Sequence, residues 1–247
     1  MQTFGLIGYP LGHSFSQKYF SQKFIDEGIA NSKFELYPIK SIDEFPSLIE
    51  STEDLKGLAV TIPYKEQVMQ YLDEIDTVAN ETGAVNCIKF QNGKLTGYNT
   101  DIIGFEKSFV PLLQSHHKKA LVLGTGGAAK AVQYVLRKLQ IPFLTVSRNK
   151  NHSTDLIQYE DIDEKLLSAY NVIINCTPLG MTPNEETFPP LPYDAISERH
   201  YLYDLVYKPS ETKFLLKGKS NGAVTKNGYD MLILQAEENW KIWNDVK

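Results

Sequence analysis

Short apolar runs alternate along the chain with longer segments in which apolar and polar residues recur at helical spacing. Runs of about four to eight apolar or β-branched residues, bounded by turn residues, are typical of buried strands. Early in the chain, three such runs predict strands at 3–8, 34–39 and 58–62. The intervening segments predict helices over roughly 17–27, from Ser41 onward and at 65–72. Because Glu44 follows Ser41 after three residues, that helix begins with a capping box.

A hairpin and a second series of alternating elements follow. The residues 85–90 and 94–99 read as two strands, and Asn92 with Gly93 between them is the strongest short signal for a two-residue hairpin turn. A helix is expected after Asp101. The second series predicts a helix at 128–139 and strands at 118–124, 142–147, 171–177 and 201–206.

The end of the chain completes an α/β pattern. The segment 183–199 is rich in proline and acidic residues and predicts an irregular surface loop. The segment 228–243 has the apolar spacing of one long amphipathic helix. Alternation of strands and helices implies mainly parallel sheets covered by helices. Because there are two such series, we expect two lobes with a ligand site in the cleft between them.

Composition and charge exclude several classes of protein. The 247-residue chain has a net charge of −5, whereas binders of nucleic acids or membrane surfaces normally present a basic face. Cys87 and Cys176 lie in apolar runs without metal-ligand spacing, so we expect buried thiols, a reducing cytosol and no bound metal. We see neither a signal-peptide pattern nor a run of about 18 apolar residues, so we expect a cytoplasmic protein without membrane spans.

The sequence LVLGTGGAA joins a buried strand directly to a helix through glycines. Gly124 permits a tight turn, Gly126 lets the backbone approach a pyrophosphate, and the small Ala129 allows close packing of helix on strand. The N–H groups and the dipole of the helix start, which includes Gly127 and Ala128, favour the pyrophosphate anion. This pattern indicates a dinucleotide site, with a plain tight turn as the alternative.

The next strand bears on which dinucleotide is bound. It ends in Ser147 and Arg148, with Lys150 close behind. An NAD site would place a carboxylate about 20 residues after the turn, but none occurs in 141–154. Arg148 can instead pair with a 2′-phosphate and stack on adenine. The stretch therefore favours NADP over NAD, and the alternative is a solvated surface arginine.

Three polar pieces, GHSFS, AVTIPYK and GYNTD, lie at predicted strand ends or helix starts. The hydroxyls of Ser14 and Ser16, beside free N–H groups at a helix start, suit a carboxylate. Lys65 follows a buried strand, and Asp101 lies at a strand-to-helix junction. Side chains carried by separate strand ends can converge, so these two residues form a candidate acid–base pair. Each of these residues also has a simpler explanation when it is considered alone. The serines and Asp101 could be ordinary helix caps, and Lys65 could be a solvated lysine.

Taken together, these pieces resemble the shikimate dehydrogenase family of NADP-dependent shikimate 5-dehydrogenases. The matching motifs follow the family's order over nearly the whole chain: GYPLGHSFS, AVTIPYK, TGAVNCI, GYNTD with Gly104, GTGGAA, INCTPLGM, DLVYKPSET and GYDMLILQA. The resemblance implies an N-terminal α/β substrate domain formed by residues 1–102 and 229–247. It implies a Rossmann-like NADP-binding domain at 103–228, with the last helix returning to the first lobe.

The resemblance also implies a role for individual residues. Lys65 and Asp101 would contact the reacting oxygen and its neighbour. Ser14 and Ser16 would hold the substrate carboxylate, with help from Tyr207. The other implied positions are Thr61, Asn86 and Gln235 at the ring hydroxyls, Thr177 against the cofactor, and Gly228 and Met231 near the nicotinamide.

The implied activity is the reversible NADPH-dependent reduction of 3-dehydroshikimate to shikimate, in the biosynthesis of chorismate and aromatic amino acids. Alternatives are a family member that also uses quinate or NAD, and a non-catalytic ligand-sensing relative, which would not need an acid–base pair. A monomer or a homodimer is expected. The chain departs from the family pattern in three places: Gln17 stands where a proline is usual, Thr125 replaces an alanine, and Lys150 lies unusually close to Arg148.

Overall fold

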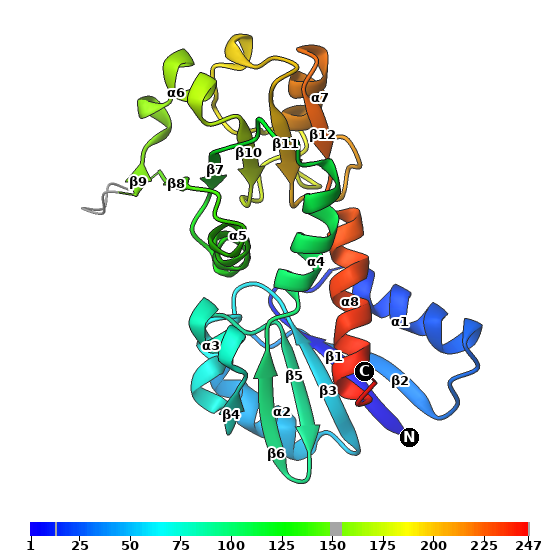
Figure 1. The fold of residues 1–247 in the computed structure, drawn as a ribbon. Helices are drawn as coiled ribbons and strands as arrows, with labels where there is room; N and C mark the ends of the chain where they lie inside the picture. Colours follow the sequence, from blue (N-terminus) through cyan, green and yellow to red (C-terminus); the bar gives the residue numbers. More distant parts are fainter. Residues whose placement is uncertain (13, 149–154, 247) are drawn as a thin grey trace. The chain divides into compact units, whose positions relative to one another are not determined.

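The chain forms two compact units, seen in a computed structural model that describes residues 1–12, 14–148 and 155–246 (Figure 1). The first unit comprises Met1–Thr100 and Ala236–Lys247, and the second comprises Asp101–Gln235. The boundaries predicted from the sequence differ from these at residues 101–102 and 229–235. Among the described residues each unit contains a six-stranded sheet with helices around it, which confirms the α/β class.

The first sheet has the strand order β2-β1-β3-β5-β6-β4. Its strands are β1 (Gln2–Ile7), β2 (Ser32–Tyr37), β3 (Leu55–Val60), β4 (Glu74–Ile75), β5 (Cys87–Gln91) and β6 (Lys94–Tyr98). Strand β1 pairs in parallel with β2 and β3, whereas β5 is antiparallel to β3 and β6. The predicted hairpin is confirmed, because Asn92 and Gly93 have φ angles of 54° and 77°, the left-handed pair that a type I′ turn requires.

Three α-helices accompany this sheet: α1 (Phe15–Asp26), α2 (Phe45–Ser51) and α3 (Thr77–Thr82). The capping box is confirmed, since the Glu44 carboxylate accepts the Ser41 N–H at 2.9 Å and the Ser41 hydroxyl accepts a backbone N–H in turn. It opens the short 3₁₀ helix that precedes α2. The α-helix predicted at 65–72 is wrong. A five-residue 3₁₀ helix (Gln67–Tyr71) forms there, in which Val68 is buried and Met69 and Tyr71 pack against the core.

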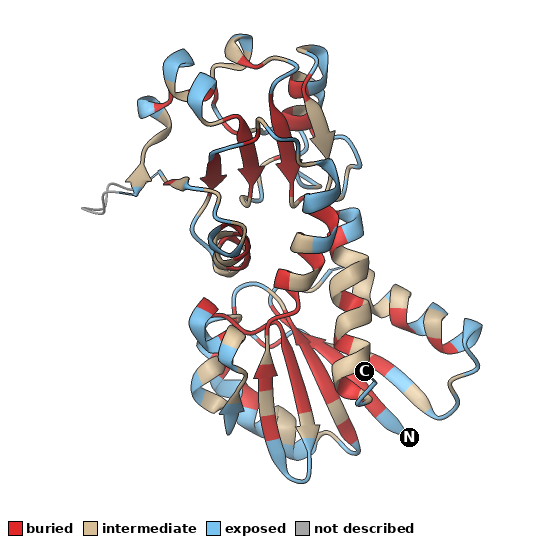
Figure 2. Ribbon diagram, in the orientation of Figure 1, coloured by how far each residue is buried: buried red, intermediate tan, exposed pale blue. Residues whose placement is uncertain are grey.

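The last helix, α8 (Tyr229–Trp243), ends in the core of the first unit. The rings of Phe4 and Trp243 lie 5.2 Å apart, and the Trp243 indole N–H donates to the Ile88 carbonyl at 3.0 Å. A Cβ at Gly57 would lie 2.2 Å from Trp243, so the strand needs a residue without a side chain where the indole packs on it. Figure 2 shows the buried strands on which these side chains pack. The predicted return of the last helix to the first lobe is confirmed.

The second sheet is entirely parallel, in the order β12-β11-β10-β7-β8-β9. Its strands are β7 (Ala120–Leu123), β8 (Phe143–Val146), β9 (Leu156–Ile157), β10 (Val172–Asn175), β11 (Tyr201–Asp204) and β12 (Val224–Lys226). The accompanying helices are α4 (Asp101–Phe109), α5 (Gly127–Lys138), α6 (Glu164–Ala169) and α7 (Lys213–Ser220). Every residue of β7, β10 and β11 is buried, as expected for parallel strands covered on both faces.

Helix α7 escaped prediction because its interior contains a glycine, which disfavours helices. A Cβ at Gly218 would lie 2.3 Å from the Leu202 side chain, so α7 packs on β11 more closely than any other residue would permit. The loop predicted at 183–199 is irregular apart from a short 3₁₀ turn at Tyr193–Ala195. Within the described ranges, no helix is long and apolar enough to cross a membrane.

The buried side chain of His117 packs against β11 of the second sheet. The His117 side chain is 4% exposed, its ring stacks on Tyr201, and its Nδ1 accepts the Gln114 N–H at 3.0 Å. Burial lowers the pKa of His117 to about 4, and burial also lowers the pKa of His200. The folded state therefore resists protonation of His117, whereas the unfolded chain takes up the proton near its ordinary pKa of 6.5.

Replacing His117 with phenylalanine should make the protein less sensitive to acid. The contribution of neutral His117 is fully present above pH 6.5 and is lost as the pH falls toward 4, at about 1.4 kcal/mol for each pKa unit. Urea unfolding at pH 7 and near pH 4.5 should show the wild type losing about 2 kcal/mol more than His117→Phe. Equal losses in the two proteins would contradict this origin of acid sensitivity.

Candidate active site

The two serines lie at the start of α1. Ser14 is the residue that caps the helix, with φ −75° and ψ 129°, and its hydroxyl makes no capping hydrogen bond. Ser16 lies inside the first turn, because α1 begins at Phe15 and not near Gln17 as predicted. Both side chains are half-buried. The first N–H groups of a helix lack partners within the helix, so this helix start combines N–H groups with hydroxyls.

Thr61 and Lys65 follow the carboxyl end of β3. The Thr61 N–H donates to the Ile7 carbonyl at 3.0 Å, and the Lys65 carbonyl accepts the Val85 N–H at 2.7 Å. A Cβ at Gly8 would lie 2.4 Å from the Thr61 methyl group, so the end of β1 passes this threonine at close range. Backbone bonds to two neighbouring segments therefore fix the turn that carries the lysine.

Asn86, predicted to bind a ring hydroxyl, is buried in a hydrogen-bond network. Its Oδ1 accepts the Thr100 N–H at 2.6 Å, and its Nδ2 donates to the Thr100 hydroxyl at 3.0 Å. The Thr100 hydroxyl donates to Oδ1 of Asn239 on α8 at 2.6 Å. Asn86 is 3% exposed and Asn239 is 1% exposed. The network therefore fixes the residue that immediately precedes Asp101.

Asp101 is the first residue of α4 and is 5% exposed. A carboxylate there is favoured by the helix dipole. In the same unit α4 and α8 touch, since a Cβ at Gly104 would lie 2.6 Å from the Met231 carbonyl and 3.1 Å from the Gln235 Cβ. The Gln235 amide donates to the Leu232 carbonyl of its own helix at 2.8 Å. Gly104 thus allows the helix of Asp101 to lie against the helix of Gln235.

The glycine turn lies between β7 and α5. Gly124 has φ +110°, a conformation that favours glycine, and its N–H donates to the Val146 carbonyl at 2.9 Å. Gly126 caps α5, which begins at Gly127 and continues through Ala128. A Cβ at Gly126 would have no neighbouring heavy atom within 4 Å. Open space above a helix start with unpaired N–H groups fits the pyrophosphate of a dinucleotide.

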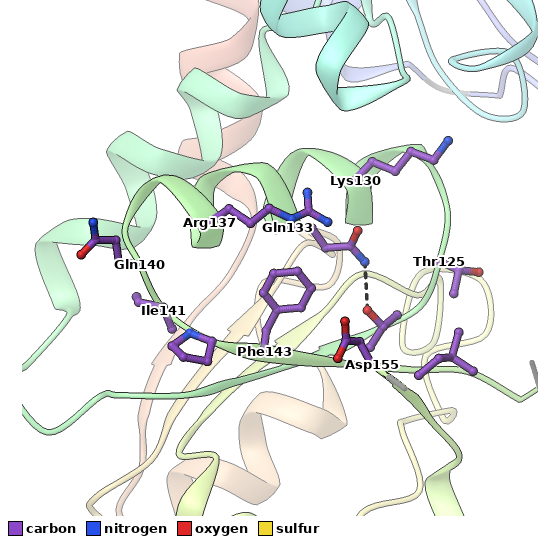
Figure 3. Close-up of a pocket in the computed structure, with 11 residues that line it drawn as sticks. Thr125, Lys130, Gln133, Arg137, Gln140, Ile141, Phe143 and Asp155 are labelled. Carbon is purple, nitrogen blue, oxygen red and sulfur yellow. Dashed lines mark hydrogen bonds between the residues drawn. The ribbon is translucent and has the colours of Figure 1, made fainter. Parts of the chain in front are cut away.

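The turn borders an open groove within the second unit. The groove has a volume of about 710 Å³, and its lining runs from Thr125 along α5 to Phe143 of β8 (Figure 3). Gln133 spans it by donating to the Thr145 hydroxyl at 3.0 Å, and the Arg137 guanidinium lies over the Phe143 ring. Among the described residues of this lining, only Thr125 belongs to the glycine turn, and the groove continues along α5 toward Gln140 and Phe143 at the amino end of β8.

Ser147 and Arg148, which are predicted to favour NADP over NAD, directly follow β8. The Ser147 N–H donates to the Ile157 carbonyl at 3.0 Å, and Arg148 is exposed, with its carbonyl accepting the Gln158 side-chain amide at 3.3 Å. Lys150, which the sequence places beside it, lies outside the described residues.

Of the remaining predicted residues, three lie on loops at the carboxyl end of the second sheet and Met231 lies in a helix. Thr177 follows β10, and its N–H and hydroxyl donate to the Asn175 Oδ1 at 3.1 and 2.6 Å. Tyr207 follows β11, is half-buried, and burial raises its pKa. Gly228 precedes α8, and a Cβ there would lie 2.2 Å from the Leu205 carbonyl. Met231, in the first turn of α8, is 7% exposed.

Sequence reasoning missed three residues of these networks: Thr100, Asn239 and Asp204. Asp204 is fully buried and accepts hydrogen bonds from Asn175 and Thr212. The signal that could have found it is a charged residue inside the apolar run YLYDLV. Across the described ranges, no group of three or more His, Cys, Asp or Glu side chains could hold a metal ion.

These features define a class of protein. A fully parallel sheet whose first βα turn is rich in glycine is the architecture of dinucleotide-binding domains. A second α/β unit carries polar side chains at strand ends and at a helix start, where ligand groups are commonly held. The chain is thus a two-unit α/β protein of the dinucleotide-binding class.

Comparison with known proteins identifies the family. Residues 6–88 match the profile described as the shikimate dehydrogenase substrate binding domain. The NADP(+)-dependent shikimate dehydrogenase of Methanosphaera stadtmanae is 36% identical, over 97% of this chain and 90% of its own length. The chain therefore belongs to the shikimate dehydrogenase family, which confirms the resemblance found in the sequence.

Solved structures agree with this assignment. The shikimate dehydrogenase of Aquifex aeolicus has a TM-score of 0.85 and 35% identity, covering 99% of this chain and 92% of that chain. The shikimate 5-dehydrogenase of Thermus thermophilus, solved with NADP(H) and shikimate, has a TM-score of 0.87 and 26% identity, covering 99% and 94%. The predicted two-lobe fold with a Rossmann-like domain is thereby confirmed.

Proposed function

We propose that this chain is an NADP-dependent shikimate dehydrogenase that catalyses the reversible reduction of 3-dehydroshikimate to shikimate. The observation that carries the proposal is the presence, in one chain of this family, of Lys65 and Asp101 together with the open glycine turn at Gly126. The related Thermus thermophilus enzyme was solved with NADP(H) and shikimate, which supports the same ligands here. The reaction serves the biosynthesis of chorismate and aromatic amino acids.

The second unit would hold the dinucleotide. The glycine turn at 124–128 would bind the pyrophosphate through backbone N–H groups, while Ser147 and Arg148 would bind the adenosine 2′-phosphate. Thr177 would lie against the cofactor, and Gly228 and Met231 would lie near the nicotinamide. When bound, NADPH supplies the hydride. The protein residues orient the two reactants and move the proton.

The proton transfer falls to Lys65 and Asp101. When the carbonyl carbon is reduced, negative charge develops on its oxygen, and the Lys65 ammonium stabilises that charge and delivers a proton. The Asp101 carboxylate orients and polarises the lysine. In the direction of shikimate oxidation the same pair accepts the hydroxyl proton. General acid–base catalysis of this kind contributes about 100- to 10,000-fold.

The substrate would be held by polar groups from several elements. Ser14 and Ser16 would bind the carboxylate at the start of α1, with Tyr207. Thr61, Asn86 and Gln235 would bind the ring hydroxyls. Asn86 donates an amide N–H to the Thr100 hydroxyl at 3.0 Å, and this bond orients the amide.

Replacing Ser14 with alanine is expected to weaken substrate binding more than turnover. One lost hydrogen bond to a charged carboxylate should raise the KM for shikimate about tenfold and leave kcat within about threefold. Steady-state kinetics with Ser51→Ala as the matched control would check this, because the exposed Ser51 hydroxyl only bonds the Leu48 carbonyl. A KM equal to that of the wild type would remove Ser14 from the carboxylate site.

A four-way absorbance assay tests the proposed function. Shikimate and quinate are each supplied with NADP⁺ and with NAD⁺, and the formation of reduced cofactor is followed. We expect the highest kcat/KM with shikimate and NADP⁺. Equal use of quinate or NAD⁺ would favour the broader dehydrogenase, and binding of shikimate without turnover in any combination would favour a ligand-sensing relative.

We further infer a cytoplasmic protein that acts as a monomer or a homodimer. Both cysteines are free, and burial raises the pKa of the Cys87 thiol, so neither is set up for a disulfide in this fold. Gel filtration with light scattering at micromolar concentration would distinguish one copy from two.

A further inference from the structure

A buried carboxyl group organises the carboxyl end of the second sheet. Asp204, the last residue of β11, is fully buried and accepts hydrogen bonds from three neutral donors. Its Oδ1 accepts the Asn175 side-chain amide at 2.9 Å and the Val206 N–H at 3.0 Å. Its Oδ2 accepts the Thr212 hydroxyl at 2.5 Å. A charged group at the end of an apolar strand is costly to bury, so its retention calls for an explanation.

The first donor, Asn175, is the last residue of β10 and contacts the loop that follows this strand. Asn175 gives its amide N–H to Asp204 and so turns its Oδ1 toward Thr177, which donates to it twice. The Thr177 hydroxyl in turn accepts the Leu179 N–H at 3.3 Å. Without an acceptor at Asp204, the amide could flip and present N–H groups to Thr177 in place of the oxygen. The carboxyl, with the Leu179 carbonyl that accepts the same amide at 3.4 Å, therefore favours the orientation that holds Thr177.

The second donor leads to the loop after β11 and to the start of α8. Val206 donates its N–H to Asp204, and its carbonyl accepts the Gly228 N–H at 3.2 Å. Tyr207 is the next residue along the chain. The single residue Val206 thus connects the carboxyl to both Tyr207 and Gly228.

The third donor leads to α7. Thr212 caps α7, with its hydroxyl accepting the Leu215 N–H at 3.4 Å while it donates to Asp204. Gly180 lies against it, since a Cβ there would be 3.1 Å from the Thr212 Cβ. The loop that carries Thr177 and the loop that carries Tyr207 therefore meet at a single side chain.

We propose that Asp204 is a positioning residue, which sets Thr177 and Tyr207 in the arrangement needed to bind NADP and the substrate carboxylate. The inference rests on the proposed function for the roles of those two residues. Its physical basis is that a carboxylate accepts at both oxygens, so it can hold all three donors at once.

The ionisation of Asp204 provides a signature that a purely structural residue would not give. Burial raises the pKa of Asp204 to about 6, although the three donors oppose the shift. The titratable groups that face it are Cys176, Tyr193 and Tyr203, which remain neutral near that pH because burial raises the pKa of each. Protonation leaves Oδ1 free to accept but converts Oδ2 from an acceptor into a hydroxyl that must donate. The link to Thr212 is then reversed.

The test compares Asp204→Asn and Asp204→Ala with the wild type by two readouts, the Kd for NADP⁺ from calorimetry and the KM values from turnover. Asparagine keeps the acceptor for Asn175 and Val206 but loses the acceptor for Thr212, so it should raise the Kd only about threefold at pH 7.5. Alanine leaves both donors buried without an acceptor, so it should raise the Kd for NADP⁺ and the KM for shikimate about tenfold or more. Asp194→Asn, at an exposed carboxylate of the same unit, is the control and should match the wild type.

If Asp204→Ala does not fold, the pH dependence of the Kd for NADP⁺ still tests the proposal. The ratio of the Kd of Asp204→Asn to that of the wild type should be about three at pH 7.5 and should approach one near pH 5, because protonated Asp204 resembles asparagine. A ratio that does not change with pH, or an alanine variant that folds and binds NADP⁺ normally, would overturn the proposal. Calorimetry is independent of turnover, so a wild type that binds NADP⁺ but leaves shikimate unchanged would refute the proposed function and not the role of Asp204.

Discussion

Replacing Lys65 with alanine, or Asp101 with asparagine, is expected to lower kcat for shikimate oxidation at least about 100-fold. Lys65 is proposed to supply the charge and the proton that the reacting oxygen requires, and Asp101 is proposed to orient the lysine. The fold should survive both changes, because alanine keeps the Lys65 carbonyl that bonds to Val85 and because asparagine also suits the start of a helix.

Steady-state kinetics, circular dichroism and calorimetry together check this expectation. The Kd for NADP⁺ should stay within about threefold of the wild type, since neither residue is proposed to touch the dinucleotide. Lys40→Ala and Glu81→Gln, at exposed positions of the first unit, are matched controls that should keep full turnover. Near-normal kcat in both active-site variants would exclude the pair from proton transfer.

Replacing Gly126 with valine is expected to raise the Kd for NADP⁺ at least about 100-fold, which corresponds to about 2.7 kcal/mol. The valine side chain would fill the space above the helix start that the pyrophosphate is proposed to occupy. The protein itself should tolerate the change, because φ at Gly126 is −77° and a Cβ there meets no atom within 4 Å. The expected cost in unfolding free energy is about 1 kcal/mol, from the poorer helix cap.

Gly124→Val is the matched comparison for this prediction. Gly124 has φ +110° and lies against Thr177 and Cys176, so valine there should destabilise the fold itself. Calorimetry with NADP⁺ and shikimate, with urea unfolding of each variant, separates the two effects. Gly126→Val should keep its affinity for shikimate, and retained affinity for NADP⁺ in that variant would contradict the placing of the pyrophosphate.

Much of the fold follows from local patterns. The apolar runs of β7, β10 and β11 are buried along their whole length, so their strands could be predicted from hydrophobicity alone. The hairpin at Asn92 and Gly93 depends on two residues that tolerate positive φ. By contrast, α7 contains Gly218, which disfavours a helix locally. This glycine is needed because the helix packs closely on Leu202 of β11, and the local sequence does not indicate that contact.

The candidate site divides in the same way. Ser14, Lys65 and the glycine turn lie beside strand ends or helix starts that can be located in the sequence, and the family motifs point to them. The residues that hold Thr177 and the segment before Asp101 in place could not be found so directly. Thr100 meets Asn239 across 139 positions of the chain, and Asn175 meets Asp204 across 29. Pairings of this kind depend on which strands and helices become neighbours in the folded protein.

Transfer of a labelled hydride tests the central claim most directly. The protein is incubated with 3-dehydroshikimate and with NADPH that carries deuterium at both hydrogens of the nicotinamide C4 position, and the product is analysed by NMR. An NADP-dependent shikimate dehydrogenase must yield shikimate with one deuterium on the new carbinol carbon, and Lys65→Ala must yield it far more slowly. NADPH that stays unconsumed, or shikimate that forms without deuterium, would contradict the account.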